Sequence, residues 1–387
     1  MKKTVFYLCA ALVFSSCATE SEMPEITMEN GVEVVLNRLE PYTLEGEPST
    51  FTLEKEFSID TENEAIAQLG LTDIGTHFAI DSEANIYLTS YENAEGMILK
   101  FDSRGNFVRS FLRKGQGPGE LEGRNYLSLN PAVDRHDNIA FSDFGNKLVV
   151  FDSDGNLIEE RKTDSSTVST SPLPNGNFLS FISVMDGRSE FINQNPLCLL
   201  DSQFDKIKEL DKQMVPNPIV GKRLKGIYYI LSWSVSDSLI FTGFQERGYT
   251  ISAYDFDGNL VRKIKKEWKP VTVSEEHKKK FMRDFSAPLF DDIRSKIYFP
   301  DAMPPFHSFF ADDKGRLFVM TYEKGENPGE FLFDIFNPDG VCTGRKGLKI
   351  LHDESGVYAK MKNGRFYCLD EKESGYKELI VAKVIWE

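Results

Sequence analysis

The chain alternates short apolar runs with polar turns that are rich in Asp, Gly and Asn. One unit, an apolar strand, an Asp-rich turn and a second apolar strand, occurs clearly at residues 79–88, 132–141 and 310–319, and more weakly at 173–179, 235–241 and 351–358. The Asp side chain accepts hydrogen bonds from the backbone of its own turn, and Gly or Asn tolerates the positive φ of a tight hairpin. Each unit therefore predicts a β-hairpin.

A second turn of the same kind follows each first one. Clear copies start at Phe101, Phe151 and Tyr254, and looser copies start at Leu200, Phe336 and Leu369. Two hairpin turns per repeat predict four strands per repeat, and most copies lie about 50 residues apart. Such units cannot bury both faces alone and close into a ring. The pattern predicts an all-β fold, a six-bladed β-propeller of four-stranded antiparallel blades.

The two ends of this region predict how the ring closes. Residues 51–59 alternate as a strand does, and residues 378–386 form a strongly apolar terminal strand. We expect the N-terminal strand to pair into the last blade, because an open ring would leave an unpaired sheet edge. Residues 31–387 are therefore assigned to a single propeller.

One long gap between repeats, between blades 4 and 5, marks an insertion at about residues 269–305. Thr272 and Glu275 fit a capping box, and Phe281, Met282 and Phe285 follow at helical spacing. We expect one short amphipathic helix at about 274–285. It would either cover one mouth of the ring as a lid or pack on the propeller as a decoration.

The N-terminus has the pattern of a targeting segment. Lys2 and Lys3 precede an apolar run at residues 5–14, which is too short to span a bilayer as a helix. The run ends at Cys17 after small residues, and this resembles the lipobox of bacterial lipoproteins, in which the Cys is acylated. The assignment is a signal peptide at 1–16, lipid attachment at Cys17 and an acidic tether at 17–30. The alternative is an ordinary secretory signal cut near Ala18.

Three stretches of the first blade carry a family resemblance. Residues 81–88, 98–111 and 115–121, the last including a GQGPGE segment, resemble the NHL repeat. The whole chain resembles the six-bladed β-propeller lipoproteins of Bacteroidetes. That resemblance implies an outer membrane lipoprotein, at the cell surface or the periplasmic face. Acidic residues after the lipidated Cys, Glu20 and Glu22, resemble a surface-export signal of such lipoproteins, although a merely solvated linker has the same composition.

Charge and cysteine content narrow the possible partners. The 45 Lys and Arg against 60 Asp and Glu give a net charge of −15, which disfavours nucleic acid. Beyond Cys9 and Cys17 the chain has Cys198, Cys342 and Cys368, widely spaced and without a CxxC motif. We expect buried free thiols and a monomeric protein, with the membrane contacted through the lipid alone.

Candidate site residues come from positions near the starts of the innermost strands. His77, Asn130, Trp233 and His307 occupy comparable places in different blades, and such positions line the central channel of a propeller. The alternative is that these side chains pack or face solvent at the mouth. The sequence supports no particular set of metal ligands at the channel, and it indicates no cofactor.

Two functions are compatible with this pattern. In the first, a lipid-anchored propeller of the envelope is a binding or scaffold module for a glycan nutrient or a partner protein, since loop variation on a rigid ring changes the ligand without changing the fold. In the second, the ring is a metal-assisted hydrolase or lyase with its site at the central channel. The sequence carries no recognisable catalytic motif such as HExxH or GxSxG.

Overall fold

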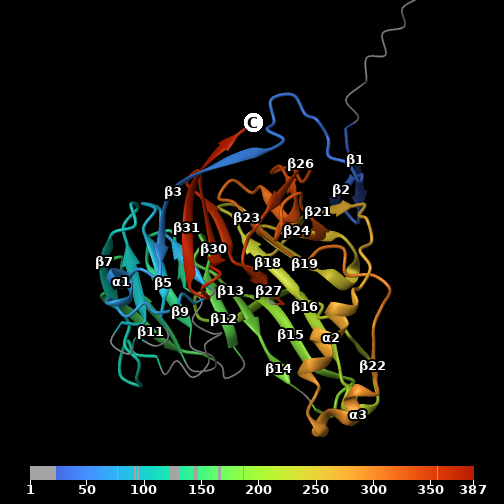
Figure 1. Ribbon diagram of the computed structural model, residues 1–387, viewed down its shortest axis with the longest axis horizontal. Coiled ribbons are helices and arrows are strands. Elements are labelled where there is room, and N and C mark those ends of the chain that lie inside the picture. The colour runs from blue at the N-terminus through green and yellow to red at the C-terminus, as the bar shows by residue number, and fades with distance from the viewer. Residues whose placement is uncertain are drawn as a thin grey trace, which may run out of the picture.

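The computed structural model describes residues 23–75, 77–90, 93, 96–121, 131–142, 147–163, 167–185, 187–354 and 356–387. Within them the chain forms six antiparallel sheets that make up a six-bladed propeller, as the repeats predict (Figure 1). The sixth sheet takes its outermost strand from the N-terminal part of the chain.

Each of the first three blades is written from its innermost to its outermost strand. Blade 1 consists of β4 (Phe78–Ile80), β5 (Ile86–Thr89), β6 (Ile98–Phe101) and β7 (Phe107–Phe111). Blade 2 consists of β8 (Ala132–Val133), β9 (Ile139–Ser142), β10 (Lys147–Phe151) and β11 (Leu157–Lys162). Blade 3 consists of β12 (Thr167–Pro172), β13 (Phe178–Ile182), β15 (Phe191–Leu200) and β16 (Lys206–Pro216), with the short β14 (Val184–Met185) beside β15.

The last three blades follow the same plan. Blade 4 consists of β18 (Leu231–Val235), β19 (Ile240–Phe244), β20 (Thr250–Tyr254) and β21 (Leu260–Lys266). Blade 5 consists of β23 (Ser308–Ala311), β24 (Leu317–Lys324), β25 (Phe331–Phe336) and β26 (Cys342–Leu348). Blade 6 consists of β29 (Ala359–Lys362), β30 (Arg365–Glu371), β31 (Lys377–Trp386) and β3 (Phe51–Asp60).

The Asp side chains accept hydrogen bonds from the backbone of their own turns, as the sequence predicts. Asp102 Oδ1 accepts hydrogen bonds from the backbone N–H groups of Arg104 and Asn106, both at 2.9 Å, and Asp102 Oδ2 accepts from the Asn106 side chain. Asp81, Asp134, Asp152 and Asp255 repeat the backbone pattern. The carboxylates therefore stabilise the hairpin turns, and Asp81 accepts one further hydrogen bond from the Tyr87 hydroxyl on β5.

The ring closes as the two chain ends predict. Strand β3 pairs antiparallel with β31 along its whole length, from Phe51 opposite Trp386 to Asp60 opposite Glu378. The Phe51 ring is fully buried and meets the rings of Trp386 and Phe318 edge-on at 5.2 and 6.0 Å. The contact with Phe318 ties the last blade to blade 5.

Two repeat copies assigned to the sixth blade are wrong. Residues 351–358 contain the β27 (His352–Asp353) and β28 (Gly356–Val357) pair, which precedes the innermost strand, and residues 369–372 run from β30 into the next loop. The true first hairpin of blade 6 turns at Asn363 and Gly364, whose φ angles are 54° and 72°. A two-residue Asn-Gly turn needs no Asp, so the search for Asp-rich turns missed it.

The boundary of the expected tether is also corrected. Residues 25–29 form β1 (Glu25–Glu29), which pairs with β2 (Val32–Asn37) through a turn at Asn30 and Gly31. Strand β2 then pairs parallel with β21, so blade 4 gains two strands on its outer edge. The edge of blade 4 is thereby covered. Cys17 and the expected signal peptide lie outside the described residues.

The insertion contains the expected helix, but its cap differs from the expected one. Helix α2 (Glu275–Asp284) begins at Ser274, whose hydroxyl accepts a hydrogen bond from the His277 backbone N–H at 3.1 Å. Thr272 lies too early to be the N-cap. Phe281 is buried and packs on Tyr228 and Phe299, while the short α3 (Asp291–Arg294) follows a 3-10 turn at Pro288–Phe290.

Three further features complete the fold. Strands β17 (Leu224–Lys225) and β22 (Ile297–Tyr298) pair in parallel and attach the insertion to the loop before blade 4. The short α1 (Glu64–Ala67) lies between β3 and β4. Cys198, Cys342 and Cys368 are buried free thiols, as expected.

In the described part of the chain, no helix has the length and apolar character needed to cross a membrane.

Candidate functional site

The predicted channel residues fall in three different settings. His77 directly precedes β4 and His307 directly precedes β23, so both lie at the end of the ring where the innermost strands begin. Trp233 lies in the middle of β18, where its ring packs on Phe181 of blade 3 at 4.8 Å. Asn130 is outside the described residues. The structure therefore brings two of the four predicted residues to one mouth.

His307 is held in a buried aromatic setting. Its ring lies 5.7 Å from the Tyr322 ring and 5.5 Å from the His352 ring, and its Nδ1 is 3.1 Å from the Ser308 hydroxyl. Burial lowers the pKa of His307 to about 4, with the nearby His352 adding to the shift and Asp353 opposing it. The His307 imidazole is therefore neutral at physiological pH.

His352 reaches this cluster from the β27–β28 pair. Its Nδ1 lies 2.9 Å from the Ile350 carbonyl, which can only accept, so Nδ1 donates this hydrogen bond. The other side of the ring meets Phe331 at 4.9 Å, and the Lys324 ammonium lies over Phe331. The cluster thus joins two imidazole rings to two aromatic rings, with the Lys324 ammonium at its edge.

A second group of side chains lies where blades 6 and 1 meet. The His77 ring contacts Tyr358 edge-on at 6.2 Å. Burial and the positive charge of Lys360 together lower the pKa of His77 to about 4, while the negative charge of Asp353 opposes this shift. Asp353 therefore acts on both His77 and His307, and the β27–β28 pair lies between the two histidines at the mouth.

The insertion reaches the same mouth. Lys280 of α2 forms an ion pair of 2.7 Å with Glu354, which follows β27 directly. The Tyr228 hydroxyl donates to Asp284 at 2.9 Å, and burial raises the pKa of Tyr228 above its ordinary value. One face of α2 is thus bound to the propeller at the rim.

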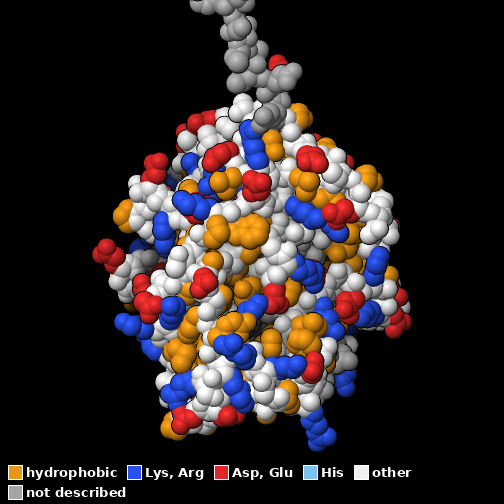
Figure 2. Space-filling model, turned by 90° about the vertical axis from the view of Figure 1, so that its right-hand side faces the viewer, with side chains coloured by type: hydrophobic (Ala, Val, Ile, Leu, Met, Phe, Trp, Pro, Cys, Tyr) orange, Lys and Arg blue, Asp and Glu red, His pale blue; other side chains and the backbone are white. Residues whose placement is uncertain are grey.

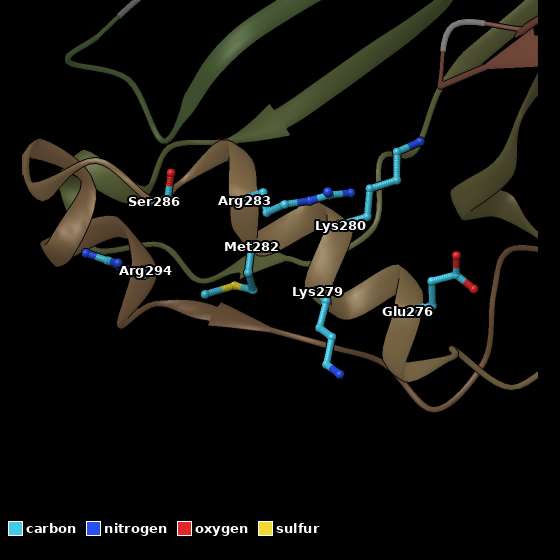
Figure 3. A pocket seen from close by; sticks show the side chains of 7 residues that line it. All are labelled: Glu276, Lys279, Lys280, Met282, Arg283, Ser286 and Arg294. Carbon is cyan, nitrogen blue, oxygen red and sulfur yellow. The ribbon is translucent and has the colours of Figure 1, made fainter.

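The exposed face of α2, which includes Lys280, lines a groove of about 810 Å³ with the turn that leads into α3 (Figure 3). Its lining is predominantly basic and consists of Glu276, Lys279, Lys280, Met282, Arg283, Ser286 and Arg294. Four of these residues are basic and one is acidic, although acidic residues outnumber basic ones by 60 to 45 in the whole chain.

Exposed apolar side chains gather at the far end of this insertion. They belong to β14, β16 and the two 3-10 turns at Pro218–Val220 and Pro288–Phe290, and they are Val184, Met185, Met214, Ile219, Val220 and Leu289. Hydrogen bonds of Asn217 to Gly187 and Ser189, and of Lys296 to Pro218, join these elements. In Figure 1, β14 and α3 lie together at this end. We call these six residues the apolar tip.

The face that carries the insertion mixes the two kinds of side chain. Figure 2 shows hydrophobic side chains interspersed with Lys and Arg over the lower part of this face. Among the residues that the structure describes, no three His, Cys, Asp or Glu side chains are placed to hold a metal ion together.

Two features of the site were not found from the sequence. The groove depends on the turn between α2 and α3, which carries no motif. Lys360 stands on β29, and this strand was missed because the first hairpin of blade 6 was assigned to residues 351–358. The alternation in Ala359–Lys362, with lysines two positions apart, was the available signal.

Six four-stranded sheets in one ring, closed by an N-terminal strand, define a β-propeller with a helical insertion at one mouth. The chain belongs to the DUF5128 family, described as a 6-bladed beta-propeller, whose model matches residues 80–339. No curated protein sequence matches it.

Solved structures with a similar arrangement include the gluconolactonase XC5397 from Xanthomonas campestris, with 12% identity, a TM-score of 0.38 and coverage of 88% of this chain and 96% of that one. BamB from Moraxella catarrhalis matches with 10% identity, a TM-score of 0.37 and coverage of 86% and 100%. Neither likeness carries an argument about function.

Proposed function

We propose that this protein is a lipid-anchored binding module of the bacterial envelope that docks a partner protein with its helical insertion. The observation that carries the proposal is the apolar tip beside the basic groove. Exposed apolar side chains that gather at one place mark interaction surfaces in soluble domains. Lys279 and Arg283 of the groove add charge complementarity for an acidic partner, while Lys280 is paired with Glu354 and Arg294 with Asp291.

The partner is inferred from this chemistry. Leu289 is 76% exposed and Met185 is 73% exposed, and such side chains gain most from burial in a partner's pocket. Lys279 and Arg283 would pair with carboxylates around that pocket. A glycan is the weaker choice, because no aromatic side chain lines the groove to stack on a sugar ring.

The location follows from the N-terminal pattern. Lys2, Lys3 and the apolar run before Cys17 support a lipoprotein signal, and the resemblance to Bacteroidetes propeller lipoproteins supports the outer membrane. Several acyl chains, at about 0.8 kcal/mol for each buried CH2, would hold the protein firmly. Replacing Cys17 by Ala should release the protein from the membrane fraction, and persistence there would contradict the anchor.

The docking surface is tested by photo-crosslinking in the native envelope. A photoreactive residue at Leu289 or Ile219 should give one defined crosslinked partner, and the same residue at Ile158 of β11, also exposed, should not. Charge reversal by Lys279→Glu and Arg283→Glu should abolish the crosslink while the melting temperature stays unchanged.

The outcomes separate the candidates. The same crosslinked band from Ile158, or a band that survives the charge reversal, would refute docking through the insertion. If the wild type instead binds an acidic polysaccharide and the charge-reversed variant does not, the ligand is a glycan and the partner-protein proposal fails.

A further inference from the structure

Two lysines on β29 set the innermost strand of blade 6 apart from the other five. As the structure bounds the six innermost strands, Lys360 and Lys362 are the only charged residues on them. Side chains two positions apart in a strand point to the same side, about 7 Å apart along the strand. Both lysines face β4 of blade 1, since the Lys360 ammonium lies 5.8 Å from the centre of the Phe78 ring and the Lys362 ammonium donates to the Ile80 carbonyl at 3.2 Å.

Lys360 has no counter-ion among the described residues. Its side chain is exposed although it lies on an innermost strand, and its ammonium has the face of the Phe78 ring beside it. Of the charged groups that face it, Lys362 on the same strand repels it, and His77 before β4 is neutral. The Asp353 carboxylate on β27 acts on His77 and has no resolved effect on Lys360. Two ammonium groups on the same side of one strand repel each other, and an anion between them offsets that repulsion.

From this placement we infer that Lys360 and Lys362 form a binding site for a small oxyanion, a phosphate or carboxylate group, where blades 6 and 1 meet at the axis. The anion would accept from the Lys360 ammonium, and the spacing of the two lysines lets a second oxygen reach Lys362. The neutral imidazole of His77 stands beside the site as a further hydrogen-bond partner. The site is separate from the groove on α2.

The pKa of Lys360 sets the pH dependence expected of this site. Burial and the charge of Lys362 together lower that pKa to about 8. A bound anion favours the charged ammonium and raises this pKa. Binding is therefore expected to be strongest below pH 8 and to weaken as the pH rises above it.

Calorimetric titration of the purified protein with sodium phosphate, and separately with succinate, tests the site. The wild type should bind at least one of the two near neutral pH, and whichever binds identifies the class of oxyanion. Lys360→Met should weaken binding about tenfold to a hundredfold, the usual worth of a charge-assisted hydrogen bond. Lys383→Met is the matched control, because it removes an exposed lysine from β31 of the same blade and should leave binding unchanged.

Three results would overturn the inference. The first is that neither anion binds the wild type. The second is that Lys360→Met binds as the wild type does, with a melting curve that shows it to be folded. The third is that Lys279→Glu with Arg283→Glu, rather than Lys360→Met, abolishes binding, which would place the anion in the groove.

Discussion

The Tyr249 hydroxyl donates a buried hydrogen bond of 2.8 Å to Asp334 Oδ2, and this bond joins blade 4 to blade 5. Arg345 donates to Oδ1 of the same carboxylate at 2.7 Å. The Lys266 ammonium lies 3.8 Å from Oδ2. Asp334 is only 1% exposed, so these groups supply its pairing in place of water. Burial and the Asp334 charge hold the pKa of Tyr249 well above its ordinary value, so the phenol keeps its proton as a donor.

Replacing Tyr249 by Phe should therefore destabilise the propeller. The change leaves one carboxylate oxygen short of a donor, and such a loss costs about 1–3 kcal/mol. Chemical denaturation measures the free energy of unfolding. Tyr376→Phe, at an exposed site, is the control, and an equal loss in both variants would argue against the role of this bond.

Replacing Phe51 by Ala should weaken the closure of the ring. The fully buried ring packs on Trp386 and Phe318, and removing a core phenylalanine costs about 3–5 kcal/mol. The same denaturation measurement applies. Ile26→Ala on β1, where the side chain is exposed, should cost little. A small loss at Phe51 would mean that β3 contributes little to closure.

The two mouth histidines should make the folded state sensitive to acid. Their pKa of about 4 in the folded protein lies below the ordinary value of 6.5, so the unfolded chain takes up protons first as the pH falls. The stability is complete above pH 6.5, declines between 6.5 and 4, and levels off below. Melting curves of a His77→Asn, His307→Asn double variant should show a flatter profile in that window.

The control for this pH profile is His136→Asn, which changes an exposed side chain in a hairpin turn. It should retain the wild-type slope between pH 6.5 and 4. If the double variant and this control have the same profile, the acid sensitivity arises elsewhere in the molecule.

Lys360→Met should raise the melting temperature in anion-free buffer near neutral pH. The folded pKa of about 8 lies below the ordinary 10.5, so the ammonium costs stability at every pH below 8, and the cost disappears between 8 and 10.5. Because channel water screens the charge, we expect a shift of only about 1–2 °C. The shift should vanish at high pH and reverse when a binding anion saturates the wild type. A melting temperature below that of the wild type in anion-free buffer would contradict an unpaired ammonium.

The fold was largely predictable because its signals are local. Turns such as that of Asp102 satisfy the backbone within four residues, so composition alone reveals them. The helix of the insertion was predictable from the spacing of its apolar residues for the same reason. The Asn363–Gly364 turn was missed because it uses positive φ angles instead of a side-chain acceptor.

The candidate site was far less predictable, since its residues meet only through ring closure. His77 and His307 were singled out from their expected places near the starts of innermost strands, and they lie directly before β4 and β23. Trp233 proves to pack between blades 3 and 4. The groove was missed because it arises from the angle between two short helical segments.

By itself, the sequence determined the repeat, the number of blades, the closing strand and the position of the insertion, because hydrogen bonds within single turns and strand periodicity encode them. Only the tertiary structure decided which charged side chains have a counter-ion nearby. Lys360 and His77 are far apart in the chain, and their proximity follows from the meeting of the last blade with the first. Whether a lysine is solvated, paired or left without a counter-ion depends on residues that are distant in the chain but close in space. A local sequence pattern does not reveal them.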